Sequence, residues 1–252
     1  MSFLEKMEKY SKFGSWAVWE STNPNGLFEK EQDMNENIDF IQYANELQPS
    51  NYVILAMNPG GTFNEHNAKK ATKKAKVSGR RWSNFHNIGR SRDYLLAKAI
   101  MSTRCYGTYM TDLFPVVGSA SKDVEKFINN KNNINVVNRF IKEFDEEMSC
   151  LLPNESEIIL ICIGKYVYKY AKKYLINNSN LEKKYKPYQF PHYSSQNGGQ
   201  VSSSINSPKY YPAVFRDKIT EYHFDLTLSK IKLWEKQYES YSENTICDRK
   251  VY

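Results

Sequence analysis

Two short polar motifs in the chain combine side chains that can do chemistry with glycines that leave the backbone open. The first is Asn58 followed by Pro-Gly-Gly, directly after the apolar run at residues 52–57. The second is His192 followed by Tyr-Ser-Ser, a few residues before another glycine pair. An amide or an imidazole can position a water or donate to a ligand oxygen, and glycines let backbone N–H groups approach an anion or a base edge. These motifs are therefore the candidate functional site.

Alternating strands and helices are expected to position the motifs. Residues 52–57, 107–114 and 158–163 are predicted strands, the last apolar throughout, as is typical of a central parallel strand. Helices are predicted at 35–47, 92–101, 121–151 with a break near 129–135, after Gly164 through 175, and at 217–238. This order predicts an α/β protein, a three-layer α/β/α sandwich with a short, mainly parallel central sheet. Ligands of such sheets bind beyond the carboxyl ends of the strands.

Length and composition favour one soluble domain. With 252 residues, 40% of them hydrophobic, we expect a single domain over 1–252 with helical extensions at 1–48 and 215–252. The longest apolar run, 158–163, is far shorter than the roughly 20 residues that span a bilayer, and the N-terminus lacks a signal-peptide pattern. A cytoplasmic monomer without membrane contact is therefore expected. The four cysteines form no CxxC pair, which argues against a disulfide framework or a zinc site.

The positive charge suits a partner that carries phosphates. The net charge is +7 and 14% of the residues are aromatic. A basic cluster beside the first motif can track a nucleic-acid backbone, or it can be a solvated surface of a loop or helix. Its members are Lys69, Lys70, Lys73, Lys74, Lys76, Arg80, Arg81, Arg90 and Arg92.

Four segments, in this order, resemble the uracil-DNA glycosylase superfamily. They are the strand ending in Asn58-Pro-Gly, the strand Thr-Tyr-Met-Thr-Asp-Leu at 108–113, the run 158–164, and His192 with Tyr-Ser-Ser. The chain is most similar to the mismatch-specific and single-strand-selective branches, whose motifs are Asn-Pro-Gly and His-Pro-Ser. The resemblance covers about residues 50 to 200. Ala56 stands where the family usually has Gly, and Tyr193 where it has Pro.

The resemblance implies a monofunctional DNA glycosylase that hydrolyses the N-glycosidic bond of a flipped-out base without a metal or other cofactor. This reaction needs a water placed against C1′ and stabilisation of the charge left on the departing base. Asn58 would hold the water, and His192 would donate to an oxygen of the base. No lysine lies in either motif to act as a Schiff-base nucleophile. Alternatively, Asn58 belongs to a turn that caps the sheet and His192 is a packed imidazole.

Asp112 bears most directly on which base is bound. Uracil-reading members of the family usually present an Asn on this strand, whereas an ionised carboxylate only accepts and suits the amino group of a cytosine-like base. The alternative is that Asp112 caps the following helix or pairs with a nearby arginine. Phe63, Trp82 and Phe85 are candidates to stack on the base, with Phe63 preferred. The residues assigned to base recognition are Asp112, Phe63, Met57 and Gly60.

Contacts to DNA are expected around both motifs. Hydroxyls and backbone N–H groups suit phosphates, an amide side chain can enter the stack as the base leaves, and guanidinium groups at a helix start can bind phosphate or form an ion pair that fixes the loop. The DNA-binding residues assigned on this basis are Gly61, Ser194, Ser195, Gln196, Asn197, Arg90 and Arg92.

Two other functions fit the same residues. One is a catalytically weak or inactive relative that binds nucleic acid or a nucleotide in the same pocket, because fold does not fix function. The other is a protein that presents its basic surface to an acidic protein partner. Salt-sensitive binding to DNA that lacks any special base would favour the first.

Overall fold

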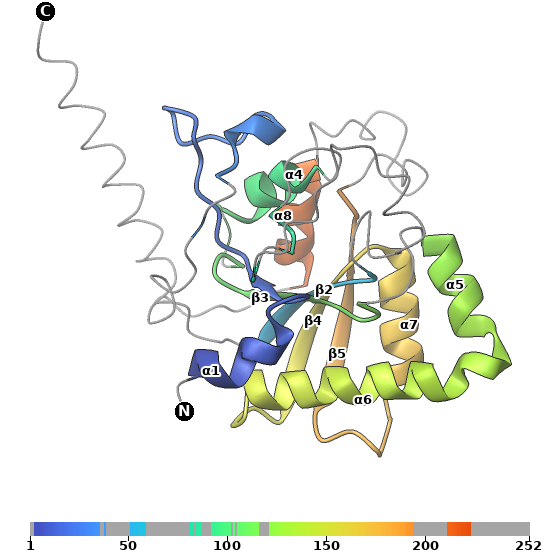
Figure 1. Ribbon diagram of the computed structural model, residues 1–252. Helices are drawn as coiled ribbons and strands as arrows, with labels where there is room; N and C mark the ends of the chain where they lie inside the picture. Colours follow the sequence, from blue (N-terminus) through green and yellow to red (C-terminus); the bar gives the residue numbers. More distant parts are fainter. Residues whose placement is uncertain are drawn as a thin grey trace, which may run out of the picture.

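The computed structural model describes residues 3–35, 38, 51–58, 81–82, 84–86, 92–101, 103, 105–115, 121–193 and 211–222. A sheet of five strands in the order β1-β3-β2-β4-β5 lies at its centre (Figure 1). The strands are β1 (Ser15–Trp16), β2 (Tyr52–Ala56), β3 (Tyr109–Asp112), β4 (Glu157–Ile163) and β5 (Lys184–Phe190).

The sheet is mixed but mostly parallel. β2 pairs in parallel with β3 on one edge and with β4 on the other, and β5 extends the parallel part beyond β4. Only β1 runs antiparallel, against β3. From β2 the chain continues to β3 on one side, and it then returns to β4 on the other side of β2 and goes on to β5. The direction in which strands are added therefore reverses between β2 and β4. Ligand crevices of α/β sheets form at this reversal, beyond the carboxyl ends of the strands.

Helices lie on both sides of the sheet (Figure 1). α4 (Asp93–Ile100) packs against α8 (Tyr211–Glu221), and α8 reaches β5 through the contact of Phe215 with Phe190. On the other side α7 (Lys165–Leu175) packs on β4 and β5, and Phe114 touches both α7 and the long helix α6 (Ile134–Leu151). The remaining helical segments are α1 (Phe3–Met7), η1 (Glu8–Tyr10), η2 (Glu31–Asp33), α5 (Ser121–Asn129) and η3 (Lys131–Asn133).

Most of the predicted elements are confirmed. Strand 52–57 is β2, strand 158–163 is β4, helix 92–101 is α4, and stretch 121–151 is α5 and α6 with the expected break at η3. The strand predicted at 107–114 is shorter, four residues, and the final helix begins at Tyr211 rather than at residue 217. The helix predicted at 35–47 lies outside the described residues. The protein therefore has an α/β fold.

Two strands were not predicted. β5 contains Pro187, which argues against a strand because proline cannot donate to a ladder. Among the described strands β5 is at the edge of the sheet, beside β4 only, and there a missing donor is tolerated. β1 has two residues, too few for a periodic pattern, and it adds part of the expected N-terminal extension to the sheet. In the described part of the chain, no helix has both the length and the apolar character to cross a bilayer.

Asp145 fixes the start of β5 to α6. Its carboxylate accepts hydrogen bonds from the backbone N–H groups of Glu182 and Lys183 at 2.6 and 3.2 Å, and from the hydroxyl of Tyr185 at 2.5 Å. Asp145 and Tyr185 are both buried. The strand that leads to His192 is therefore anchored at its amino end by one side chain.

We expect Asp145→Ala to lower the free energy of unfolding by about 2–4 kcal/mol, because three donors lose their acceptor in a largely buried region. Urea denaturation measures this change. Glu146→Ala is the matched control, since Glu146 is the exposed neighbour on α6, and its effect should stay within about 0.5 kcal/mol. If the two variants had the same midpoint of urea denaturation, Asp145 would not anchor β5.

Candidate functional site

The parallel pairing brings three predicted site residues to one edge of the sheet. Asn58 follows the end of β2 by two residues, Asp112 is the last residue of β3, and His192 follows the end of β5 by two residues. Ala56 is paired with Asp112, and two further backbone bonds continue the pairing past the strands, from Leu113 N to Ala56 O and from Phe114 N to Met57 O, both 3.0 Å. The turn that carries Asn58 is thereby fixed to the end of β3.

His192 lies against Gly164, directly beyond the end of β4. A Cβ added to Gly164 would stand 3.4 Å from Cδ2 and 3.5 Å from Cβ of His192. Gly164 also has φ +107°, a backbone conformation that side chains rarely adopt. Its N–H donates to the carbonyl of Phe190 at 2.8 Å, which holds the two strand ends together. The imidazole of His192 thus packs on Gly164 at the carboxyl end of β4, next to the point where the strand order reverses.

The imidazole of His192 is neutral at physiological pH. Burial lowers its pKa from 6.5 to about 4, because a charged ring would lose its hydration. The ring stacks on Tyr193 with 4.8 Å between centroids and 24° between planes. A neutral imidazole still offers one N–H donor, so this environment suits donation to a ligand oxygen.

Tyr193, which departs from the family motif, connects the His192 turn to the helix α4. Its hydroxyl donates to the buried carboxylate of Asp93, and this neighbouring charge together with burial raises the pKa of Tyr193 well above its usual value. Its ring meets Tyr211 of α8 edge-on, with 6.1 Å between centroids. A proline would supply the turn but neither contact. Tyr193 therefore fixes the position of His192 relative to α4 and α8.

Asp112 is buried, with 2% of its surface exposed, and is held by Asn84. The side-chain N–H₂ of Asn84 donates to Oδ2 of Asp112 at 2.7 Å and to the carbonyl of Phe13 at 2.6 Å. Burial raises the pKa of Asp112 from 3.8 to about 7, more than the Asn84 bond lowers it, and the nearby carboxylates of Glu147 and Asp93 raise it further. Its described partner is thus an amide, not an arginine, and its two protonation states coexist near neutral pH.

The backbone around Asn84 is strained. Trp82 and Phe85 have φ of +61° and +64°, which is unfavourable for bulky residues. Both side chains are buried, and Trp82 packs against Trp16 and Tyr109 at 6.5 Å each, so the two rings belong to the core rather than to a stacking platform. Such strain persists where the surrounding structure enforces it, often at ligand sites. Here it presents the amide of Asn84 to Asp112.

Three buried polar atoms near this edge have no hydrogen-bond partner among the described residues. They are Oδ1 of Asp112, the hydroxyl of Tyr211 and Nη1 of Arg92. Tyr211 packs against Tyr193, and the charge of Asp112 contributes to the raised pKa of Tyr193. Arg92 directly precedes Asp93, which accepts the hydrogen bond from Tyr193. Since buried polar groups are nearly always satisfied, these atoms are natural partners for a bound ligand.

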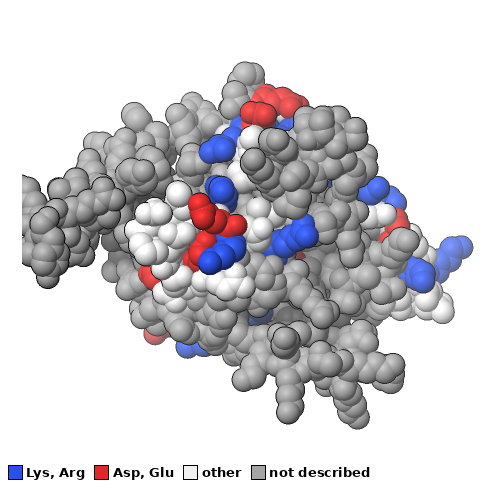
Figure 2. Space-filling view, turned by 90° about the horizontal axis from the view of Figure 1, so that it is seen from above, with Lys and Arg blue, Asp and Glu red and all other residues white. Residues whose placement is uncertain are grey.

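Other assigned residues have different outcomes. Met57 is described and buried, next to Asn58. Of the basic cluster, Arg92 adopts the left-handed conformation before α4, and Arg81 pairs with Glu8. Seen from above, the described surface intersperses basic and acidic side chains (Figure 2). The assigned site residues outside the described ranges are Gly60, Gly61, Phe63, Arg90, Ser194, Ser195, Gln196 and Asn197. The basic-cluster residues Lys69, Lys70, Lys73, Lys74, Lys76 and Arg80 also lie outside them.

Sequence reasoning missed three residues that shape the site. Asn84 gave no signal, because one Asn in an irregular segment is common and its contact with Asp112 is 28 residues away in sequence. Gly164 is predicted only as the residue before a helix, although a glycine directly after an apolar run is a signal for a positive φ. Tyr193 was interpreted as a departure from a motif rather than as a link to Asp93.

The described residues contain no group of three or more His, Cys, Asp or Glu side chains arranged to hold a metal ion. His86 is buried in the core, where its Nε2 lies 3.0 Å from the carbonyl of Trp16 and its ring lies against Trp19. Burial lowers the pKa of His86 to about 3. His86 is therefore a structural residue.

Comparison of the chain with protein-family models, with curated proteins and with solved structures found no match.

The raised pKa of Asp112 predicts a pH-dependent effect of Asp112→Asn. Between about pH 4 and pH 7 the folded protein keeps a proton that the unfolded chain releases, so the wild type loses stability as pH rises through this window. The variant lacks this loss, and its stability relative to wild type should increase by up to about 1.4 kcal/mol per pH unit, then level off above pH 7. Urea unfolding from pH 4 to 8 measures it. A constant difference would refute the raised pKa.

Gly164→Ala should destabilise the protein and change the surroundings of His192. The strained backbone costs about 1–3 kcal/mol, and the new methyl group would stand at ordinary van der Waals distance from the imidazole. Gly26→Ala is the matched control, because Gly26 also has positive φ but nothing lies within 4 Å of the added Cβ. Thermal unfolding and the imidazole NMR signals of His192 report the two effects. If only stability changes, and the His192 signals match those of the control, Gly164 does not position His192.

Proposed function

We propose that this protein is a DNA glycosylase with a uracil-DNA glycosylase-like fold, acting on a flipped-out base. One observation carries the proposal. Asp112 is buried at the end of β3 with one carboxyl oxygen lacking a described partner, at the same sheet edge as Asn58 and the neutral His192. An amide, a neutral N–H donor and a carboxyl group at the carboxyl ends of neighbouring strands can supply the three tasks of the reaction: holding water, stabilising the leaving group and reading the base.

Asn58 and His192 divide the chemistry between them. Asn58 orients a water toward C1′ through its amide. The glycosidic bond breaks as positive charge develops on the sugar, the water oxygen then bonds to C1′, and the proton that the water loses neutralises the departed base by way of solvent. His192 donates its imidazole N–H to an oxygen of the base, which stabilises the negative charge that the base carries away. Because the neutral imidazole keeps one N–H, it can donate at physiological pH without carrying a positive charge. An amide is a poor base, so the rate rests on positioning and leaving-group stabilisation.

Asp112 selects the base through its protonation state. Ionised, its free oxygen accepts from the amino group of a cytosine-like base. Protonated, it donates to a carbonyl oxygen such as O4 of uracil. With a pKa of about 7 both forms are present near neutral pH. We therefore propose that release of modified cytosine-like bases increases with pH relative to release of uracil-like bases.

The DNA contacts assigned from the sequence complete the proposal. Ser194 and Ser195, which directly follow Tyr193, would bind phosphates with Gly61, and Gln196 or Asn197 would fill the space left in the stack. Base flipping costs least in single strands or at mismatches, so these are the preferred substrates.

The test is release of the base from single- and double-stranded oligonucleotides that carry uracil, modified cytosines or hypoxanthine, followed by alkaline strand cleavage. Asn58→Ala and His192→Ala should each lower the rate by about a hundredfold, since each removes a positioned group that acts in the transition state. Asn154→Ala, which removes an exposed amide in the turn before β4, should have no effect.

Asp112→Asn sharpens the assay, because an amide both donates and accepts at every pH. Uracil release should then persist above pH 7, while release of cytosine-like bases should fall. The proposal fails if no oligonucleotide yields an abasic site, or if the Asn58 and His192 variants remain as active as Asn154→Ala. Salt-sensitive binding without base release would instead identify a nucleic-acid-binding protein.

A further inference from the structure

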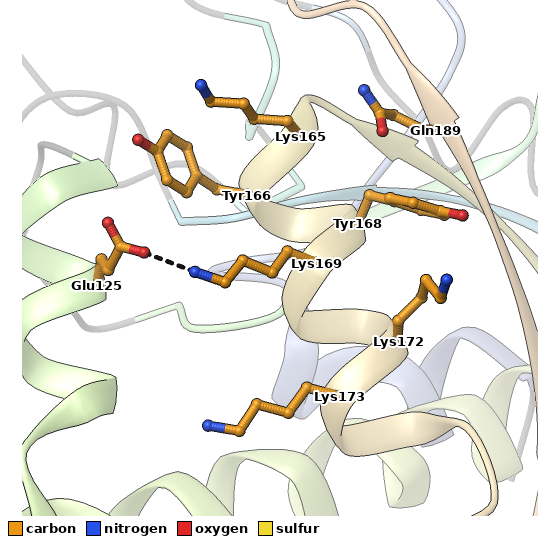
Figure 3. Close-up of a pocket in the computed structure, with 8 residues that line it drawn as sticks. All are labelled: Glu125, Lys165, Tyr166, Tyr168, Lys169, Lys172, Lys173 and Gln189. Atoms are coloured by element: carbon orange, nitrogen blue, oxygen red, sulfur yellow. Dashed lines mark hydrogen bonds and ion pairs between the residues drawn. The ribbon is translucent and has the colours of Figure 1, made fainter.

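A basic groove of about 800 Å³ runs along the outer face of α7 (Figure 3). Sequence analysis did not identify it, since its residues lie outside both motifs in the sequence and outside the basic cluster that follows the first. Its lining consists of Lys165, Tyr166, Tyr168, Lys169, Lys172, Lys173, Gln189 and Glu125.

Positive charge dominates the groove. Four lysines line it against one carboxylate, Glu125 of α5. That carboxylate is paired with Lys169 at 2.9 Å, and Tyr170 also donates to it at 3.2 Å. Lys172 and Lys173 are exposed and have no carboxylate within ion-pair distance among the described residues. Their charge is therefore available to an anionic partner.

Aromatic rings alternate with these lysines along α7. Lys165 lies over the ring of Tyr166 at 5.1 Å, and Lys172 over the ring of Tyr168 at 5.4 Å. Tyr166 and Tyr168 are only partly buried, so each keeps part of its surface at the groove. Figure 3 shows both tyrosines beside the lysine side chains. Cations interleaved with partly exposed rings can bind phosphates and unpaired bases at once.

The spacing of the lysines fits more than one phosphate. Lys165 and Lys172 are seven residues apart, which corresponds to about 10 Å along a helix. A row of charges of this length can contact more than one phosphate of a single strand. A single nucleotide or free phosphate would engage only part of such a row.

The groove begins where the candidate site ends. Lys165 directly follows Gly164, the residue against which His192 packs. At the other wall Gln189 of β5 pairs with Cys162 and lies three residues before His192. A strand that leaves the carboxyl edge of the sheet between β4 and β5 meets the lysines of α7 next.

We propose that the groove along α7 binds a single-stranded nucleic-acid segment, with the lysines contacting phosphates and Tyr166 and Tyr168 contacting bases. This interaction goes beyond the proposed function, because it requires neither a special base nor cleavage. It supplies a second contact region that holds the strand next to the site.

The test uses the full chain and a fluorescent oligo-dT of about 20 nucleotides, with binding followed by anisotropy across a series of salt concentrations. Lys172→Gln/Lys173→Gln should weaken binding several-fold and reduce the slope of log K against log salt by about 1 to 2, because two phosphate contacts are lost. Lys6→Gln/Lys12→Gln is the control, with the same change in charge at exposed lysines of the N-terminal segment. It should bind as the wild type does.

Tyr168→Leu tests the proposed contact with bases separately from the contacts with phosphates. It should weaken binding to the oligonucleotide while leaving the salt slope unchanged, since no charge is removed. The proposal would be overturned if both double lysine variants lost the same affinity for oligo-dT, or if Lys172→Gln/Lys173→Gln bound it as tightly as the wild type does. So would binding of poly-glutamate that responds to these variants as strongly as oligo-dT binding does.

Base release distinguishes this proposal from the proposed function. If no base is released but oligo-dT binding falls in the α7 variants, the groove stands and the glycosylase does not. If base release depends on Asn58 and His192 but oligo-dT binding is unchanged in the α7 variants, the glycosylase proposal is supported and the proposal for the groove is wrong.

Discussion

The strand β2 is hydrogen-bonded along both edges, in parallel with β3 and with β4, and all five of its residues are buried. Burying an aliphatic side chain contributes about 1.5–3 kcal/mol, so this strand has little freedom to slip. A shift by one residue would also reverse which side chains face each side of the sheet. The register of Ala56 against Asp112, and with it the placement of Asn58, follows from this strand.

Removal of water at the carboxyl edge then sets the chemistry of the site. The same burial that keeps His192 neutral brings the pKa of Asp112 to about 7. Burial lowers the pKa of the histidine and raises the pKa of the aspartate, because a buried environment disfavours both an imidazolium and a carboxylate. Asn84 stabilises the ionised form of Asp112, and Tyr193 fixes His192 from the other side. The two side chains therefore carry little fixed charge at this end of the sheet.

The sequence predicted the parts of this arrangement that depend on local pattern. The apolar runs of β2 and β4 identify buried strands, and the first motif directly after β2 indicates the end of the sheet at which the structure places Asn58, Asp112 and His192. β5 was not predicted because Pro187 is compatible with a strand only at an edge, and edge position depends on the whole sheet. The contacts of Asn84 with Asp112 and of Tyr193 with Asp93 join distant segments, so no local pattern could indicate them.

We propose that one flipped nucleotide contacts Asn58, Asp112 and His192 together. The first measurement is fluorine NMR of an oligonucleotide that carries 2′-fluoro-2′-deoxyuridine, because the electron-withdrawing fluorine opposes positive charge on the sugar and so preserves the bound substrate. The fluorine resonance should shift on binding, and it should shift differently with Asp112→Asn and with His192→Ala. A bound oligonucleotide whose fluorine resonance stays at the free position, in wild type and variants alike, would contradict it.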